Sequence, residues 1–246
     1  MIYLTGFHAI EERIKSGQPC GALLVAKPGP RARELTVLAN ERKIRTDRVG
    51  TIELDRIAPD HKGIALEVDE DSGETIVSLE EFLNGIGNAE DGKKDVLVII
   101  LDEITDPHNY GAILRSSDQF GVDLVITRRR RIAKHADIVA KTSAGASAWI
   151  PQAETANLPR AMEQLKEAGF WIYGADMEGE PAYKRDLRGR TAIILGGEET
   201  GITRLLRENC DLMIGVPSYG RIDSLNVSVA AGVLLYEVMR QRKSKQ

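Results

Sequence analysis

Apolar and polar stretches alternate along the chain in short units that fit an α/β protein. Residues 95–101 are apolar beyond the first residue and rich in β-branched side chains. Such a run is typical of a strand covered on both faces, as in a parallel sheet. Shorter strands are expected around residues 124–127, 149–150, 170–174, 191–195 and 212–216. Because helical patterns separate them, we expect five or six parallel strands with helices on both sides of the sheet.

The predicted helices begin and end at recognisable signals. One helix starts near Asn109 and ends before Gly121, and another covers residues 159–168 and ends before Gly169. Glycine is favoured after a helix because it adopts left-handed backbone angles without strain. Further helices are predicted at residues 138–146 and 204–209.

The last helix follows the segment Ser-Leu-Asn-Val-Ser at residues 224–228. Residues 229–236 are almost wholly apolar, which predicts a buried helix. The small polar side chains before this run are good helix N-caps, because they accept hydrogen bonds from unpaired backbone N–H groups. This pattern alone fits two interpretations, a capped helix in the core and a ligand site at the N-terminus of the helix.

The first 70 residues repeat the alternation on a smaller scale, with helices at 7–14 and 31–42 and strands at 22–26, 44–49 and 64–68. The chain then becomes acidic and rich in turn-forming residues. Within this stretch, Ser78 followed by Glu81 predicts a capping box that opens a short helix. We therefore expect a small α/β domain at residues 1–70, a linker at 71–94 and a larger domain at 95–246.

Composition excludes several classes of protein. The chain has 246 residues and is 42% hydrophobic, which is enough for a substantial core. No apolar run reaches the roughly 18 residues needed to span a bilayer, and the N-terminus does not resemble a signal peptide. The two cysteines lie far apart and the four histidines are scattered, so neither a disulfide nor a metal site is predicted. We expect a cytoplasmic protein.

Three basic runs stand out against a net charge of −4. Residues 128–134 read RRRRIAK, beginning with Arg128, Arg129 and Arg130, and the tail from residue 240 reads RQRKSKQ. A single run is usually a solvated face, but three on an acidic chain indicate an anion-binding surface. The run at residues 27–48 contains Lys27, Arg31, Arg33, Arg42, Lys43, Arg45 and Arg48.

Three segments that follow strands carry unusual side chains at the edge of the sheet where parallel α/β proteins bind ligands, and the third of them is the segment at residues 224–228 described above. In the first loop Asn109 opens a helix and Arg115 follows six residues later. Taken alone, Asn109 could be a cap and Arg115 could pair with Asp118. The second loop reads GGEETG at residues 196–201, where glycines let backbone approach a ligand closely and Glu198 adds a carboxylate.

The three motifs together resemble those of the SpoU family of RNA ribose 2′-O-methyltransferases, within the SPOUT superfamily. N-x-G-x-x-x-R follows one strand, G-G-E-x-x-G a later one, and S-L-N-V-S-x-A opens the last helix. The N-terminal unit and the segment His-Lys-Gly-Ile at residues 61–64 are similar to the subgroup that methylates a guanosine of 23S ribosomal RNA.

This resemblance implies a C-terminal parallel-sheet SPOUT domain with a deep trefoil knot and a small N-terminal α/β RNA-binding domain that is ribosomal protein L30e-like. It implies a homodimer that binds RNA, with an active site built from both subunits, and S-adenosylmethionine bound in the knot. The catalytic positions it implies are Asn109, Arg115, Glu198, Ser224 and Asn226. The cofactor-binding positions it implies are Gly196, Gly197, Gly201, Val216 and Leu225.

The implied reaction moves a methyl group from a sulfonium to a ribose 2′-hydroxyl, which is a poor nucleophile and must be oriented and deprotonated. A guanidinium stays charged in proteins, so we expect Arg115 to anchor a phosphate or an alkoxide. A phosphate, a water or Glu198 would then take the proton. The basic runs, with Lys27, Arg31, Arg33, Arg42, Lys43, Arg128, Arg129 and Arg130, are expected to contact RNA phosphates.

Three alternatives remain open on the sequence. A dinucleotide-dependent dehydrogenase on a conventional sheet would need a glycine fingerprint that the chain lacks. A non-catalytic RNA-binding protein of the same fold would not need the matched polar residues. Within the family, transfer RNA is the alternative substrate.

Overall fold

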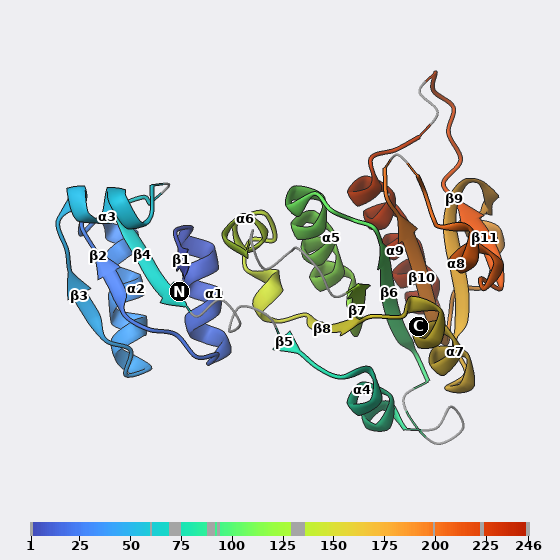
Figure 1. The fold of residues 1–246 in the computed structure, drawn as a ribbon, viewed down its shortest axis with the longest axis horizontal. Helices are drawn as coiled ribbons and strands as arrows, with labels where there is room; N and C mark the ends of the chain where they lie inside the picture. Colours follow the sequence, from blue (N-terminus) through green and yellow to red (C-terminus); the bar gives the residue numbers. More distant parts are fainter. Residues whose placement is uncertain are drawn as a thin grey trace. The chain divides into compact units, whose positions relative to one another are not determined.

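The chain folds into two compact units in a computed structural model (Figure 1). The residues it describes are 2–59, 61–68, 75–87, 92, 94–128, 136–198, 200–221 and 224–244. Arg129 and Arg130, predicted to contact RNA, lie outside these residues. The first unit consists of Met1–Thr75, Tyr110–Arg115 and Arg131–Trp149, and the second of Ile76–Asn109, Ser116–Arg130 and Ile150–Gln246.

The first unit contains a four-stranded sheet in the order β1-β4-β2-β3. Its strands are β1 (Ile2–Leu4), β2 (Leu23–Val25), β3 (Thr46–Arg48) and β4 (Ile64–Val68), and its first helices are α1 (Phe7–Ser16), α2 (Pro30–Glu41) and α3 (Thr51–Ile57). Side chains of α1 and α2 pack with Leu23 and Leu66 on one face, whereas Leu54 of α3 packs with Leu24 and Ala65 on the other. The predicted α/β alternation is confirmed, although β1 and α3 were not predicted.

A later segment of the chain completes this unit. Helix α6 (Ala136–Thr142) contributes Ala140 to the core on the α1 side of the sheet, and a short 3-10 turn, η2 (Ala146–Ala148), follows. The indole Nε1 of Trp149 donates a hydrogen bond to Glu12 Oε2 at 2.5 Å. The strand predicted around residues 149–150 is displaced, because Trp149 ends a segment that packs on α1 and the strand begins only at Pro151.

The second unit contains a seven-stranded sheet in the order β11-β9-β10-β6-β7-β8-β5. Neighbours from β11 to β8 pair in parallel, which confirms the prediction of five or six parallel strands. The strands are β5 (Thr75–Ile76), β6 (Val96–Asp102), β7 (Leu124–Arg128), β8 (Pro151–Thr155), β9 (Trp171–Pro181), β10 (Arg190–Gly196) and β11 (Leu212–Gly215). All seven residues of β6 are buried, as expected for a central strand covered on both faces.

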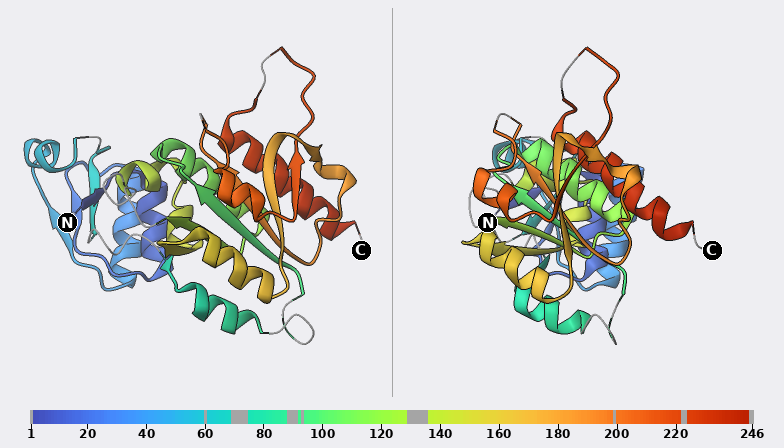
Figure 2. Two further views of the ribbon diagram at one scale, coloured as in Figure 1. Left: turned by 45° about the vertical axis from the view of Figure 1, so that its right-hand side comes forward. Right: turned by 90° about the vertical axis from the view of Figure 1, so that its right-hand side faces the viewer.

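Helices cover both faces of this sheet. They are α4 (Leu79–Ile86), α5 (Pro107–Phe120), α7 (Leu158–Glu167), α8 (Arg204–Glu208) and α9 (Val227–Lys243). Alternate side chains of β6, Val98 and Ile100 among them, pack in one core with residues of α4, α7 and α8. Figure 2 shows α4 and α7 on one side of the sheet and α9 on the other. No helix in the described part of the chain is long and apolar enough to cross a membrane.

The capping box predicted before α4 is confirmed. The Ser78 hydroxyl accepts a hydrogen bond from the Glu81 backbone at 3.0 Å, and the Glu81 carboxylate accepts one from the Ser78 backbone at 3.1 Å. The Ser78 hydroxyl also donates to the Glu81 carboxylate at 2.9 Å, and the bonds from the Ser78 backbone and hydroxyl lower the pKa of the Glu81 carboxyl. Helix α4 then buries Ile86 against the core of the second unit.

Helix α9 is amphipathic rather than wholly buried, so the prediction of a buried helix is wrong for one of its faces. Leu234, Leu235 and Val238 are buried. On the opposite side Val233 is 41% exposed and Tyr236 is 50% exposed. An apolar run predicts a helix but does not say how much of its circumference is covered.

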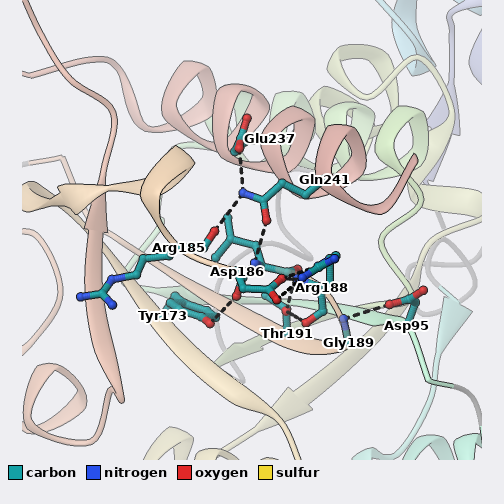
Figure 3. Close-up of polar contacts among 10 residues, drawn as sticks. Asp95, Tyr173, Arg185, Asp186, Arg188, Gly189, Thr191, Glu237 and Gln241 are labelled. Atoms are coloured by element: carbon teal, nitrogen blue, oxygen red, sulfur yellow. Dashed lines mark hydrogen bonds and ion pairs between the residues drawn. The ribbon is translucent and has the colours of Figure 1, made fainter. Parts of the chain in front are cut away.

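The C-terminal end of α9 is fastened to the loop before β10 (Figure 3). The Gln241 side chain accepts a hydrogen bond from the Leu187 backbone N–H at 2.9 Å and donates one to the Arg185 carbonyl at 3.0 Å. The Arg242 guanidinium donates to the carbonyl oxygens of Val96 and Gly189. Both side chains hold the helix against the amino-terminal ends of β6 and β10.

Candidate active site

A cavity of about 650 Å³ lies at the carboxyl ends of β9, β10 and β11 in the second unit. Its walls come from the end of β10 and the turn after it, from the end of β11, and from the start of α9. This is the edge of a parallel sheet where ligands bind. All five predicted cofactor positions line it: Gly196, Gly197, Gly201, Val216 and Leu225.

The glycine turn after β10 is required by close backbone contact. A Cβ atom on Gly196 would lie 2.1 Å from the carbonyl carbon of Gly201, so only glycine fits there. Gly201 has a φ of +62°, a conformation that glycine adopts without strain, and its N–H donates to the Gly197 carbonyl at 2.9 Å. The turn is therefore tight, and its glycines bring backbone to the cavity wall beside Glu198 and Thr200.

Three polar side chains that are distant in the sequence meet beside this turn. The Asn109 amide nitrogen donates a hydrogen bond to Glu198 Oε1 at 2.8 Å, and the Asn226 amide nitrogen donates to the same oxygen at 2.6 Å. The Asn226 nitrogen also lies 3.1 Å from Asn109 Oδ1, within hydrogen-bond range. The structure thus brings together three of the five predicted catalytic residues, and we name them the amide–carboxylate cluster.

Helix caps position two of the three members of the cluster. Asp106 caps α5 by accepting hydrogen bonds from the backbone of His108 and Asn109, which places Asn109 in the first turn. Asn226 is the N-cap of α9, because its Oδ1 accepts the Ser228 backbone N–H at 3.0 Å. The prediction of a polar cap is confirmed at Asn226, and the same side chain joins the cluster.

The other two predicted catalytic residues lie outside the cluster. Ser224 is exposed and lines the cavity. Arg115 is exposed on α5, less than two turns after Asn109, and it forms no salt bridge with Asp118. An exposed cation of this kind is accessible to a phosphate from solvent.

Some cations predicted to bind RNA have partners within the chain. Arg31 pairs with Glu11 at 2.9 Å and with Glu34 at 2.7 Å, and Arg128 lies 3.5 Å from Asp102. Five predicted cations in the first run are exposed, namely Lys27, Arg31, Arg33, Arg42 and Lys43.

Cysteine and metal chemistry find no support in the described residues. Burial raises the pKa of the Cys210 thiol to about 11, and burial also raises the pKa of Cys20. Both thiols are therefore protonated near neutral pH and are poor nucleophiles. Among the residues with described positions, no group of three or more His, Cys, Asp or Glu side chains could hold a metal ion.

One wall of the cavity was not predicted. Strand β9 continues to Pro181, beyond the expected end at residue 174, and its residues Ala175, Asp176, Met177 and Glu178 line the cavity. Their sequence, ADME followed by GEP, is polar and turn-like, so it carries no strand signal. Gly179 permits the extension, because a Cβ there would lie 2.5 Å from the carbonyl carbon of Ile214 in β11.

Comparison with known proteins matches both parts of the chain. Residues 96–236 match the SpoU rRNA Methylase family, and residues 3–72 match the family described as RNA 2′-O ribose methyltransferase substrate binding. A Xanthomonas axonopodis protein named 23S rRNA (guanosine-2′-O-)-methyltransferase RlmB is 41% identical over 216 residues, covering 87% of this chain and 84% of its own. A Borreliella burgdorferi protein named as an uncharacterized tRNA/rRNA methyltransferase is 38% identical over 218 residues, covering 87% and 96%.

Among solved structures, the SpoU methyltransferase AviRb from Streptomyces viridochromogenes, in complex with AdoMet, superposes with a TM-score of 0.76. It is 24% identical and the match covers 98% of this chain and 90% of that one. The parallel sheet, the polar cluster at its strand exits and the substrate-binding domain define an RNA 2′-O-methyltransferase. The chain belongs to the SpoU rRNA methylase family. The family resemblance and the α/β fold predicted from the sequence are confirmed.

Proposed function

We propose that the enzyme transfers a methyl group from S-adenosylmethionine to the ribose 2′-hydroxyl of a guanosine in 23S ribosomal RNA. The observation that carries this proposal is the amide–carboxylate cluster of Asn109, Glu198 and Asn226, of which Glu198 and Asn226 also line the cavity. The guanosine and the 23S RNA are supported by the relative named for that activity, which is 41% identical.

The cavity has the properties of a cofactor site. Its volume of about 650 Å³ suits a small molecule, and its lining combines glycine backbone with apolar side chains such as Leu195 and Ile214. When bound, S-adenosylmethionine supplies an electrophilic methyl group on a sulfonium. In this proposal the backbone of Gly196, Val216 and Leu225 faces the adenosine part.

The cluster would act on the acceptor ribose. Two amide N–H donors hold Glu198 Oε1, so the carboxylate is fixed in direction before RNA arrives. Such preorganised groups lower the cost of orienting a weak nucleophile. We assign Glu198 to hold the 2′-hydroxyl and to take its proton, Ser224 to contact substrate at the cavity rim, and Arg115 to anchor a phosphate or the developing alkoxide.

The first unit would bind the RNA. Its residues 3–72 match a substrate-binding family, and Arg33, Arg42 and Lys43 present exposed positive charge. Phosphate contacts of this type give affinity that falls with salt concentration.

We also propose that the enzyme is a homodimer that acts in the cytoplasm and contains the trefoil knot that the family resemblance implies. The exposed apolar stripe of α9 supports the dimer, because Val229, Val233 and Tyr236 recur at helical spacing on one face. Exposed apolar stripes of this kind are typical of protein–protein contacts.

Ribose methylation should be mapped in ribosomal and transfer RNA from cells with and without the gene. We expect one guanosine of 23S RNA to lose its 2′-O-methyl group and to regain it when purified enzyme and S-adenosylmethionine are added. Loss of a methyl group in transfer RNA instead would support the alternative substrate. Full methylation of both RNAs in the mutant cells would contradict the proposal.

A further inference from the structure

Asp102 is a fully buried carboxylate beside the cofactor cavity, and it is not one of the predicted site residues. It is the last residue of β6 and pairs in register with Gly196 of β10, where the glycine turn begins. Its side chain is 0% exposed. A buried carboxylate is costly unless its oxygens are paired, so each oxygen should have an identifiable partner.

The two oxygens have different partners. Oδ2 accepts the backbone N–H of Thr203 at 2.8 Å. Thr203 lies two residues after Gly201 and is the N-cap of α8, so this bond fixes the point where the glycine turn joins the helix. Oδ1 forms no hydrogen bond among the described residues, and the Arg128 guanidinium lies 3.5 Å from it.

The backbone directly after Asp102 has an unusual conformation where it contacts the glycine turn after β10. Glu103 has a φ of +59°, which is uncommon for a residue other than glycine. A Cβ on Gly197 would lie 3.2 Å from the Glu103 carbonyl oxygen, tighter than most real contacts. The end of β6 and the turn after β10 therefore touch at backbone level, and left-handed angles of this kind persist only where the surroundings enforce them.

We propose that Asp102 is a positioning residue for the cofactor site. Through the Thr203 N–H it holds the turn that carries Gly196, Gly197 and Glu198, and Arg128 supplies the charge that compensates for its burial. The inference rests on the proposed cofactor, because the turn it holds forms a wall of that cavity. It also gives Arg128, a cation predicted from the sequence to bind RNA, a partner inside the protein.

The test is S-adenosylmethionine affinity, measured by calorimetry on the full-length protein without RNA. Hydrogen bonds to charged groups are among the stronger ones in proteins, so we expect Asp102→Asn and Arg128→Gln each to raise the Kd about tenfold, and Asp102→Ala to raise it more. The matched control is Asp123→Asn. Asp123 accepts the Leu97 N–H at 2.9 Å near the opposite end of β6, so it makes the same kind of bond away from the cavity.

A turnover measurement separates positioning from general destabilisation. For Asp102→Asn we expect the KM for S-adenosylmethionine to rise while the KM for RNA stays unchanged and kcat largely recovers at saturating cofactor. Should Asp102→Ala fail to fold, Arg128→Gln decides the question, because this side chain is 44% exposed and its loss leaves no cavity.

The inference would be overturned if Asp102→Asn and Arg128→Gln bound S-adenosylmethionine as tightly as Asp123→Asn does, with a similar loss of Tm in all three variants. Absence of S-adenosylmethionine binding by the unchanged protein is a different result, because it would overturn the proposed cofactor and the inference with it. Weaker binding by both variants, with Asp123→Asn unchanged, is the outcome that supports it.

Discussion

The side-chain amide of Asn226 has two roles, one for its oxygen and one for its nitrogen. Its oxygen accepts the Ser228 backbone N–H and thereby caps α9, and its nitrogen donates to Glu198 and Asn109. The backbone N–H of Ser228 needs an oxygen, so the cap fixes which end of the amide faces the cluster. The hydrogen bond that caps α9 therefore also orients Asn226 in the candidate active site.

Replacing Asn226 with Ser should separate the capping of α9 from the hydrogen bond to Glu198. Serine is about as good an N-cap as asparagine, so we expect the free energy of unfolding to change by less than about 0.5 kcal/mol. The amide donors to Glu198 are lost, and methyl transfer should fall about 100-fold, the usual effect of removing one oriented donor. Denaturant unfolding and turnover with RNA are the measurements. Near-normal turnover would mean that Asn226 is a cap only.

Arg115 provides a second test at the residue scale. If it acts as a cation that anchors phosphate or alkoxide, Arg115→Lys should keep substantial turnover, within about tenfold of the unchanged enzyme, and Arg115→Gln should lose far more. RNA affinity measured alongside serves as the control. Near-total loss in Arg115→Lys with intact RNA binding would contradict the anchoring role.

Helix α9 connects the site to the opposite edge of the sheet. Its first turn carries Asn226 at the cavity, and its last turn holds the loop before β10 through Gln241 (Figure 3). One face is buried on the sheet, and the other exposes apolar side chains, of which Tyr236 meets the ring of Phe120 edge-on at 6.1 Å between centroids. The helix is therefore apolar over residues 229–236, where one face is buried, and polar at both ends, where Asn226 and Gln241 form hydrogen bonds.

The Gln241 anchor should contribute measurably to stability. In Gln241→Leu the backbone N–H of Leu187, a fully buried residue, loses its acceptor, which should cost about 1–3 kcal/mol. Arg204→Ala is the control, because its ion pair with Glu208 on α8 is exposed and such pairs contribute little. Urea unfolding of both variants is the measurement. Equal stability of the two would show that the anchor is not needed.

The exposed stripe of α9 should control the oligomeric state. A charge in the centre of an apolar interface is strongly unfavourable, so Val233→Asp should convert the proposed dimer to a monomer in analytical ultracentrifugation. Ile52→Asp is the control, because Ile52 is 72% exposed on α3, outside the stripe. A dimer that survives Val233→Asp would place the interface elsewhere.

The chain combines two family matches, a substrate-binding match over residues 3–72 and a methylase match over residues 96–236. The enzyme is acidic overall, so RNA must be attracted by local charge rather than by net charge. We propose that the exposed cations at and beside α2 provide such a surface in the first unit.

Charge reversal should reveal this surface. The double variant Arg33→Glu and Arg42→Glu should weaken RNA binding at least tenfold, and the slope of log affinity against log salt should fall by about two. The matched control is Arg56→Glu on α3, which packs on the opposite face of the same small sheet from α2. Filter binding at several salt concentrations measures both quantities. Equal losses in all variants would indicate a net-charge effect.

The sequence by itself determined the local structure and the family. Periodicity identified five of the six parallel strands, and the Ser78 capping box was readable from two residues. Two of the three short motifs marked segments that line the cavity, and the first marked the loop that carries Asn109. These features depend on residues within a few positions of one another, because helix caps, tight turns and hydrophobic periods are local interactions.

Only the tertiary structure decided which distant residues meet. Asn109, Glu198 and Asn226 are far apart in the chain and share hydrogen bonds because strand order brings their loops to one edge of the sheet. Trp149 lies in an apolar stretch that resembled a strand, and only the structure shows that it contacts Glu12 of α1. Only the structure shows, likewise, that a buried oxygen of Asp102 accepts the Thr203 N–H. A side chain's partners are set by strand order, register and coverage, and these emerge only when the whole sheet is assembled.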